Sequence, residues 1–514
     1  MIKWMLFPVK GEEMKQRKVV SALLILVLCM ISFAGCVGRS NSLSKDEIKK
    51  GSVSTGISCH DPQIIVGADG LYYMTGSHQI LASSSDLQNW NYIANGSNMF
   101  ANIFKGDMEA FAYVGKNSDG GYSIWASNIY YNKVMNKYLM YFCTTSSDIK
   151  SNLCLAQADT PEGPYEYVTN FLYSGWDKNT VDQTNVKSIL GEDANLDRYY
   201  EYGGYDKDLW PNCIDPAVFE DSDGNQWLTY GSWSGGIFLL QLDPSTGLPM
   251  HLDGVSDNTD PYFGTRIAGG GIHAIEGPYI DYNKNTGYYY LFVSYGSLQS
   301  NGGYQIRQFR SENVTGPYVD AKGNSLEAQE DYSNYGIKMM GNYTLPSLDV
   351  TYMAPGGQSI FTGNDNTKYI VYHQRFDDGE EYHEPRIHQM FMNEDGWYTI
   401  SPFEANETET SLSEYSEGDL EGRYYILNHG IDVGSLINET VECTLKDGKI
   451  SSEDEQYVGT YSLKKDSNFV TFTLDGIDYK GVFSDMLDEA GNNTRVFSAV
   501  GDNNQTIWAI QYLK

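Results

Sequence analysis

The chain has 514 residues and a formal net charge of −32, with 41 Tyr, 20 Phe, 9 Trp and 52 Gly. This acidic balance excludes nucleic acid as the expected partner, because a phosphate backbone requires clustered Lys and Arg. An uncharged partner such as a neutral polysaccharide fits better. The abundance of aromatic residues and glycines, with few long apolar helical patterns, predicts an all-β structure.

The first predicted element is a targeting segment. Basic residues from position 15 onward precede an apolar run over residues 19–33, and small residues lead to Cys36, as is typical of a signal peptide. The ending "FAGC" resembles a bacterial lipobox, so we expect residues 1–36 to be a signal and Cys36 to carry a lipid. An ordinary signal peptide or a membrane anchor is the alternative. The polar residues 37–55 are predicted to be a tether, and the protein to be extracellular or a cell-surface lipoprotein.

Five scattered cysteines follow the signal without any CxxC spacing: Cys59, Cys143, Cys154, Cys213 and Cys443. An odd number cannot all pair, so the sequence does not predict a disulfide framework. A bridge between Cys143 and Cys154 and buried free thiols are both compatible with these positions.

Three segments of the chain repeat one pattern. They are "HDPQIIVGADGLYYMTGS" from His60, "IDPAVFEDSDGNQWLTYGSW" from Ile214 and "IEGPYIDYNKNTGYYYLFVSYG" from Ile275. In each, an acid precedes Pro directly or across a Gly. A short apolar strand, an Asp/Asn/Gly turn and an aromatic strand follow, which is typical of a β-hairpin. Two further segments, residues 123–145 and 358–376, share the hairpin without the acid.

Five such units between residues 56 and 404 predict a five-bladed β-propeller, because radial repetition of four-stranded sheets makes this fold. The acids occupy equivalent positions at the start of a blade's inner strand. We therefore expect Asp61, Asp215 and Glu276 to face one another in an axial pocket, with unrelated turn acids as the alternative. Residues 174–210 lack a clear strand pattern and are predicted to be an extended surface loop.

The remainder, residues 405–514, alternates apolar and polar residues over short runs separated by Asp-Gly and Asn turns. This pattern predicts a small C-terminal antiparallel β-barrel domain. Binding of carbohydrate and bracing of the propeller are both compatible with it, and nothing in it looks catalytic.

Three carboxyl groups around one pocket fit the chemistry of glycoside hydrolysis. One carboxyl group, protonated, gives a proton to the leaving oxygen, and another, ionised, attacks the sugar or activates water. Glu276 lies between Ile275 and Gly277 and suits the acid, because partial burial raises the pKa of a carboxyl group. Asp61 suits the base, and Asp215 would tune the acid.

Four segments in order carry a family resemblance: "SCHDPQII", "NCIDPAVFEDSDGNQWLTYGSW", "IHAIEGPYIDYNKNTGYYYLFVSYG" and "VYHQRF". Together they resemble glycoside hydrolase family 43, and most of all its endo-α-1,5-L-arabinanases. The resemblance covers about residues 56–404, and the tail resembles the C-terminal barrel of two-domain extracellular members. It implies an inverting mechanism on arabinan, a side chain of pectin. It also implies that Asp61 is the general base, Asp215 the residue that orients and tunes the acid, and Glu276 the general acid.

The same resemblance implies a metal and several substrate contacts. His373 of "VYHQRF" resembles a histidine that holds a calcium ion, otherwise mostly water-ligated, in the axial channel. Without the resemblance a buried, hydrogen-bonded histidine would be expected, because calcium prefers oxygen. Asn128 falls in "WASN", which departs from the "WAPD" of many relatives. The residues expected to contact substrate are Asn128, Asn212, Ser232, Trp233 and Ser234.

Two other functions stay open at this point. An exo-acting arabinosidase or β-xylosidase of the same family would result if residues 174–210 wall off one end of the cleft. A non-catalytic glycan-binding lipoprotein is the other, although binding alone does not need all three acids. We expect a monomer that touches the membrane only through its lipid anchor.

Overall fold

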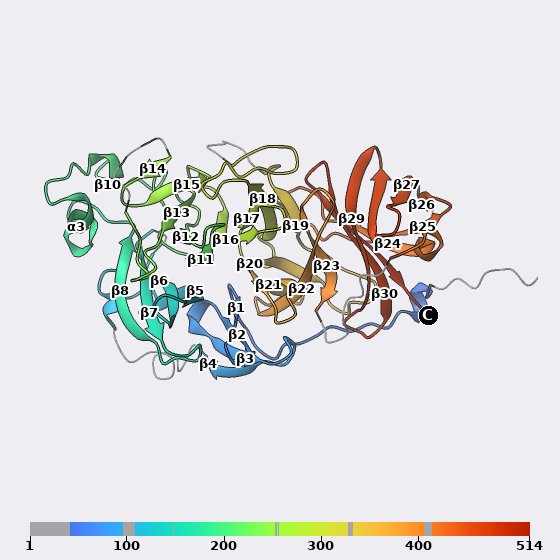
Figure 1. The fold of residues 1–514 in the computed structure, drawn as a ribbon, viewed down its shortest axis with the longest axis horizontal. Helices are drawn as coiled ribbons and strands as arrows, with labels where there is room; N and C mark the ends of the chain where they lie inside the picture. The colour runs from blue at the N-terminus through green and yellow to red at the C-terminus, as the bar shows by residue number, and fades with distance from the viewer. Residues whose placement is uncertain are drawn as a thin grey trace, which may run out of the picture.

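The computed structural model describes residues 42–514 apart from 96–107, 148, 252, 253, 255, 257, 327–332 and 406–413. The predicted signal and Cys36 therefore lie outside the described residues. Five blade sheets and a closed eight-stranded barrel make up the fold (Figure 1). The predicted all-β class, with a five-bladed propeller followed by a C-terminal barrel, is confirmed.

Each blade is an antiparallel sheet whose first strand lies nearest the propeller axis. The strands of blades 1 and 2 are β1 (Gln63–Val66), β2 (Tyr72–Thr75), β3 (Leu81–Ser84), β4 (Asn91–Ala94), β5 (Ser123–Asn132), β6 (Lys137–Thr145), β7 (Ser151–Ala158) and β8 (Glu166–Tyr173). Blade 3 has the order β11-β12-β13-β15-β14 and consists of β11 (Ala217–Glu220), β12 (Gln226–Tyr230), β13 (Ile237–Gln241), β14 (Thr259–Asp260) and β15 (Gly264–Ala268).

Blades 4 and 5 complete the propeller with β16 (Ile275–Asn283), β17 (Tyr288–Tyr295), β18 (Gln305–Ser311), β19 (Ile337–Met340), β20 (Tyr352–Thr362), β21 (Lys368–Phe376), β22 (His383–Met392) and β23 (Tyr398–Glu404). Apolar side chains fill the spaces between neighbouring blades. The ring closes through side-chain packing, since Ile64 and Met74 of blade 1 share one buried cluster with Val371 and Ile387 of blade 5.

The segment over residues 174–210, predicted to be an extended surface loop, has its own buried aromatic residues. It forms η4 (Val181–Gln183), α3 (Val186–Leu190), η5 (Asp197–Tyr199) and the hairpin of β9 (Tyr200–Glu201) and β10 (Gly204–Tyr205). Trp176, Tyr199 and Trp210 belong to the same apolar cluster as the cores of blades 2 and 3. The segment lies at the surface, as predicted, but it is folded and not extended, because irregular backbone can bury aromatic rings without a periodic sequence pattern.

The barrel consists of β24 (Gly422–Asn428), β25 (Val441–Lys446), β26 (Lys449–Ser452), β27 (Val458–Leu463), β28 (Phe469–Leu474), β29 (Ile477–Leu487), β30 (Asn493–Gly501) and β31 (Thr506–Tyr512). Its outer surface packs on blades 4 and 5, and Trp508 and Tyr343 share one buried cluster across this contact. Residues 42–55, part of the predicted tether, include η1 (Lys45–Glu47) and run along the barrel, where Ser42 pairs with Leu513 (Figure 1).

Three short 3-10 helices complete the described elements: η2 (Ser77–Gln79), η3 (Met108–Phe111) and η6 (Glu417–Leu420). All five cysteines after the signal are buried and free, so Cys143 and Cys154 are not bridged. Within the described part of the chain, every helix is too short or too polar to span a bilayer.

Candidate active site

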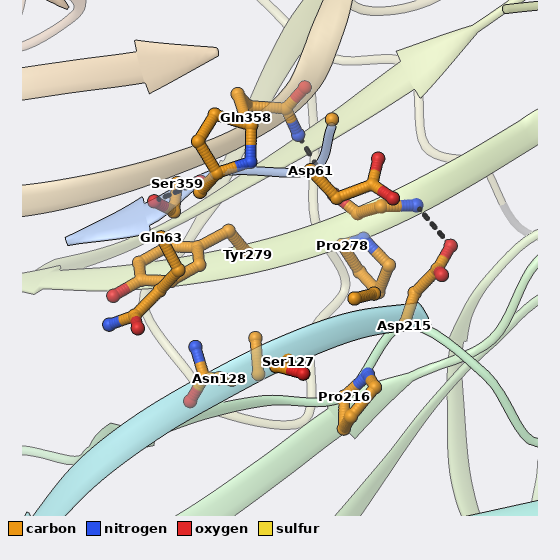
Figure 2. A pocket seen from close by; sticks show the side chains of 15 residues that line it. Asp61, Gln63, Ser127, Asn128, Asp215, Pro216, Pro278, Tyr279, Gln358 and Ser359 are labelled. Atoms are coloured by element: carbon orange, nitrogen blue, oxygen red, sulfur yellow. Dashed lines mark hydrogen bonds between the residues drawn. The ribbon is translucent and has the colours of Figure 1, made fainter. Parts of the chain in front are cut away.

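Every blade has a left-handed residue at its axial end, before the inner strand in blades 1 and 3 and within it in blades 2, 4 and 5, and the φ angle of this residue lies between 46° and 58°. The five residues are Asp61, Ala126, Asp215, Gly277 and Gly357. In blades 2, 4 and 5 the strand pairing shifts register at this point, as expected for a β-bulge that redirects the chain. The two residues that follow in each blade line a narrow axial channel (Figure 2).

This repeat corrects the alignment of the three acids. Asp61 and Asp215 are themselves the left-handed residues, whereas Glu276 comes one position earlier, before Gly277. The three acids therefore do not occupy equivalent positions, as the sequence pattern had predicted. The counterparts of Glu276 in blades 1, 2 and 3 are His60, Trp125 and Ile214. The turn nevertheless brings all three carboxyl groups to one cavity of about 310 Å³, because both positions face it.

Asp61 is buried among groups that stabilise its ionised form. His60 Nδ1 lies 2.8 Å from Asp61 Oδ2, and the Ser77 hydroxyl donates to the same oxygen at 2.5 Å. Burial by itself raises the pKa of Asp61, but the charge of His60 and the hydrogen bonds from His60 and Ser77 outweigh it and lower the pKa below its ordinary value. Asp61 is thus an ionised carboxylate held in a strained backbone conformation, a combination that marks functional sites.

Glu276, unlike Asp61, favours its protonated form. Burial raises its pKa, the donors Tyr304 and Ser232 lower it in part, and the charge of Asp61 raises it again, so the pKa stays above its ordinary value. The hydroxyl of Tyr304 donates to Oε1 at 2.8 Å and that of Ser232 to Oε2 at 2.9 Å. Glu276 therefore retains its proton at a pH where Asp61 is ionised.

Asp215 lies beside this pair and contacts the backbone next to Glu276. The Gly277 amide donates to Asp215 Oδ2 at 3.1 Å. Burial, then the charges of Glu276 and Asp61, hold the pKa of Asp215 well above its ordinary value. Ionisation of one carboxyl group in this cluster thus opposes ionisation of the next.

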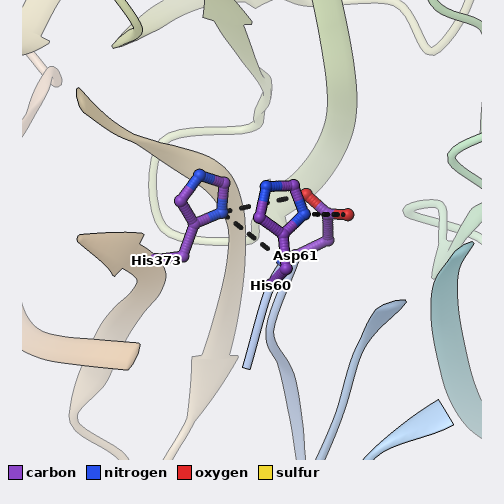
Figure 3. Close-up of side chains that lie close together, drawn as sticks. All are labelled: His60, Asp61 and His373. Atoms are coloured by element: carbon purple, nitrogen blue, oxygen red, sulfur yellow. Dashed lines mark hydrogen bonds and ion pairs between the residues drawn. The ribbon is translucent and has the colours of Figure 1, made fainter. Parts of the chain in front are cut away.

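A histidine cluster borders the base (Figure 3). The rings of His373, from β21, and His60 stack with centroids 4.0 Å apart, and His373 Nδ1 lies 3.8 Å from Asp61 Oδ1. Gly357 makes this approach possible, since a Cβ there would lie 2.4 Å from Asp61 Oδ1 and 2.8 Å from His373 Nδ1. Among the described residues, Nε2 of His373 is buried without a hydrogen-bond partner.

These groups are compatible with a cation. His60, Asp61 and His373 each offer one ligand atom, and these atoms all lie within 4.8 Å of one another. Two nitrogens and one carboxylate oxygen are few ligands for calcium, which takes six to eight oxygens, so water would have to supply most of the shell. The buried Nε2 atoms of His60 and His373, both without a hydrogen-bond partner among the described residues, are the features of this cluster that a cation would satisfy.

The predicted substrate contacts separate into three groups. Ser232 contacts Glu276, and Trp233, next to it, is left-handed and 38% exposed. Ser234 and Asn212 are both buried, and Asn212 Oδ1 accepts from Ser174 at 3.4 Å.

Asn128 lies apart from the 310 Å³ cavity. It is 4% exposed in the axial channel, and its side-chain oxygen accepts from the Val218 amide at 3.2 Å, which joins blades 2 and 3 (Figure 2). The structure therefore gives Asn128 a part in blade packing, and it does not place the side chain where a substrate in this cavity would lie.

Sequence reasoning missed several residues of the cavity: His60, Ser77, His78, Leu298, Arg375 and His383. His60 and Arg375 lie within the quoted segments "SCHDPQII" and "VYHQRF", so proximity to the base and to His373 was an available signal. Ser77 and Leu298 come from loops between strands, and only the fold brings such loops to the axis.

An ionised aspartate and a protonated glutamate in one propeller cavity define the residue set of a glycoside hydrolase. Comparison with known families points the same way. Residues 192–398 match the model described as glycosyl hydrolases family 43, and residues 402–509 match a C-terminal lipocalin-like domain.

Relatives extend over nearly the whole chain. A Bacillus subtilis (strain 168) protein named extracellular endo-alpha-(1->5)-L-arabinanase 2 is 34% identical over 474 residues, which are 88% of this chain and 92% of the relative. An extracellular endo-alpha-(1->5)-L-arabinanase of Thermotoga petrophila is 34% identical over 478 residues, which are 88% and 93% of the two chains. The crystal structure of the family 43 YxiA protein from Bacillus licheniformis matches with a TM-score of 0.76 at 34% identity and covers 88% of this chain and 98% of that one. The protein belongs to glycosyl hydrolases family 43.

Proposed function

We propose that the protein is an extracellular enzyme that hydrolyses internal α-1,5 linkages of arabinan with inversion at the anomeric carbon. One observation carries this proposal. Asp61 and Glu276, with opposite protonation preferences, line one cavity of a chain that is 34% identical over 88% of its length to two proteins named endo-arabinanases. Anchoring through Cys36 stays a prediction, which mass spectrometry of the mature N-terminus would check.

In the proposed reaction, Glu276 gives its proton to the glycosidic oxygen as the bond from that oxygen to the anomeric carbon breaks. Asp61 takes a proton from a water molecule whose oxygen bonds to the anomeric carbon from the opposite face. Asp215 accepts the Gly277 amide and so orients the backbone of the acid, and its charge is coupled to that of Glu276, whose charge contributes to the raised pKa of Asp215. Trp233, exposed beside Ser232, would stack on a sugar ring.

Product analysis on linear α-1,5-arabinan tests this proposal. Purified residues 37–514 are incubated with the polymer, with calcium or with chelator, and the products are separated by chromatography. A ladder of arabino-oligosaccharides is the expected result. Arabinose alone would indicate exo action, and intact folded protein without any product would contradict arabinan hydrolysis.

We also propose that a calcium ion binds at His373, which would supply positive charge beside the base. The support is the buried, unpartnered Nε2 and the clustering of His373 with His60 and Asp61. His373→Ala is expected to lower the bound calcium of the purified protein and to reduce activity. Metal analysis after dialysis measures this, and His251→Ala, in blade 3, is the control that should retain calcium. Unchanged calcium content in His373→Ala would contradict the ligand role.

The pKa directions predict a bell-shaped pH dependence of kcat/KM. Asp61 has to be ionised, and its pKa is lowered from 3.8, so the acidic limb should lie below the ordinary range of an aspartate. Glu276 has to be protonated, and its pKa is raised from 4.5, so activity should fall as pH rises through a value above that of an ordinary glutamate. Initial rates on linear arabinan across pH measure both limbs. A basic limb below 4.5 would contradict the assignment of the acid.

A further inference from the structure

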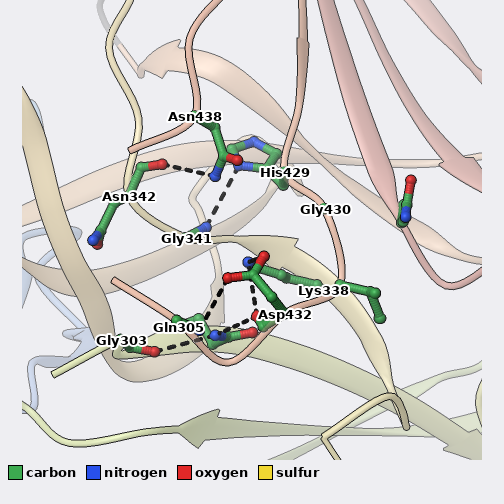
Figure 4. Close-up of polar contacts among 12 residues, drawn as sticks. Gly303, Gln305, Lys338, Gly341, Asn342, His429, Gly430, Asp432 and Asn438 are labelled. Atoms are coloured by element: carbon green, nitrogen blue, oxygen red, sulfur yellow. Dashed lines mark hydrogen bonds and ion pairs between the residues drawn. The ribbon is translucent and has the colours of Figure 1, made fainter. Parts of the chain in front are cut away.

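A loop of the C-terminal barrel reaches into the propeller beside β18 (Figure 4). This barrel loop, residues 429–440, connects β24 to β25. The side-chain amide of Gln305 donates to the carbonyl oxygen of Asp432 at 3.0 Å, and Arg307 donates to the carbonyl oxygen of Ile431. Lys338 Nζ donates to the same Asp432 carbonyl at 3.0 Å. All three propeller side chains are buried, so these contacts are shielded from water.

The barrel loop also closes on the backbone at the start of β18. Gly303 is left-handed, with φ 72°, and a Cβ there would lie 3.0 Å from the Val433 carbonyl oxygen. The Gln305 amide that binds Asp432 donates to the Gly303 carbonyl as well, at 3.1 Å. Both chain neighbours of Tyr304 are therefore fixed by the barrel loop.

Tyr304 links the barrel loop to the active site. Its side chain is 2% exposed, and its hydroxyl donates to Glu276 Oε1 at 2.8 Å. Its ring stacks on that of His373, with centroids 5.5 Å apart and planes 14° apart. Because Ser232 donates to the other oxygen, the two donors together determine the plane of the Glu276 carboxyl group.

We propose that Tyr304 is a positioning residue for the general acid Glu276 and that the barrel loop holds Tyr304 in place. The C-terminal barrel is then part of the catalytic apparatus, although none of its described residues lines the cavity. This inference rests on the proposed function, because it assigns a role to Tyr304 through the acid of that reaction.

The first test is Tyr304→Phe, which removes only the hydroxyl group. We expect kcat on linear arabinan to fall roughly 10- to 100-fold, as for the loss of a hydrogen bond to an ionisable group, with KM nearly unchanged. A dinitrophenyl arabinobioside, whose leaving group needs no proton, should be hydrolysed at close to the wild-type rate. Equal losses on both substrates, or no loss on arabinan, would overturn the positioning role.

The second test addresses the link to the barrel. Gln305→Ala should show the same arabinan-selective loss of kcat, about threefold, since it leaves the Tyr304 hydroxyl in place. Asn393→Ala is the matched control, because it removes a hydrogen bond from the propeller to the barrel residue Lys480 that involves neither Gln305 nor Lys338. Lys338→Met tests the same link if Gln305→Ala does not fold. Wild-type kinetics in Gln305→Ala and Lys338→Met, or an equal loss of kcat in Asn393→Ala, would refute the role of the barrel loop.

Crystal structures of the wild-type protein and of Tyr304→Phe separate this inference from the proposed function. A reoriented Glu276 carboxyl group in the variant is the expected result, and an unmoved one would overturn the positioning role whatever the substrate. Wild-type protein that is inert on arabinan would instead refute the proposed function alone.

Discussion

Replacing Glu276 with Gln is expected to lower kcat on linear arabinan by about 100- to 10,000-fold, which is the usual contribution of a general acid. The amide has the size of the carboxyl group, and its oxygen can accept one of the hydrogen bonds from Ser232 and Tyr304 while its nitrogen donates to the other hydroxyl, but it has no acidic proton to give to the leaving oxygen. Affinity for arabino-oligosaccharides, measured by calorimetry, should stay close to that of the wild-type protein.

A substrate with a good leaving group distinguishes loss of the general acid from loss of the folded structure. A dinitrophenyl arabinobioside should be cleaved by Glu276→Gln far better than arabinan is, because its departure needs no protonation. Glu220→Gln is a matched control: this glutamate also accepts a tyrosine hydroxyl, from Tyr130 at 2.6 Å, but lies at the far end of β11. Near-full activity of Glu276→Gln on arabinan would exclude Glu276 as the acid.

Asp61→Asn is expected to lower kcat by a similar factor of about 100 to 10,000, but on both substrates. Water has to be deprotonated whichever group leaves, and an amide has no basic oxygen of comparable strength. The dinitrophenyl substrate should therefore not rescue this variant, in contrast to Glu276→Gln. Steady-state rates of the two variants on the two substrates distinguish base from acid.

Asp69→Asn controls for the loss of a carboxylate in the same blade. Asp69 accepts the Tyr73 hydroxyl at 2.7 Å in the turn between β1 and β2, away from the cavity. It should keep wild-type kinetics. Rescue of Asp61→Asn by the good leaving group would reassign Asp61 to support of the acid.

Much of the fold was predictable because strand and turn patterns are local properties of the sequence. Aromatic strands joined by Asp/Asn/Gly turns determine hairpins, and their repetition determines a propeller. Asp61 and Asp215, each followed by Pro at the start of an inner strand, could be placed at the axis on this basis. Glu276 was misaligned by one position, because backbone torsion decides which residue makes the turn, and Gly277 adopts φ 58° in its blade.

The sequence by itself determined the blade repeat, the barrel and the identity of the three acids, since each depends on residue types at short spacing. Only the tertiary structure decided what surrounds them. Ser77 reaches Asp61 from another loop of blade 1, Tyr304 reaches Glu276 from the start of β18 in the same blade 4, and Ser232 reaches Glu276 from blade 3. The contact of the barrel loop with Gly303 is also decided by the tertiary structure, because Gly303 and Val433 lie about 130 residues apart along the chain. Such contacts follow from how complete domains pack, and no local pattern encodes them.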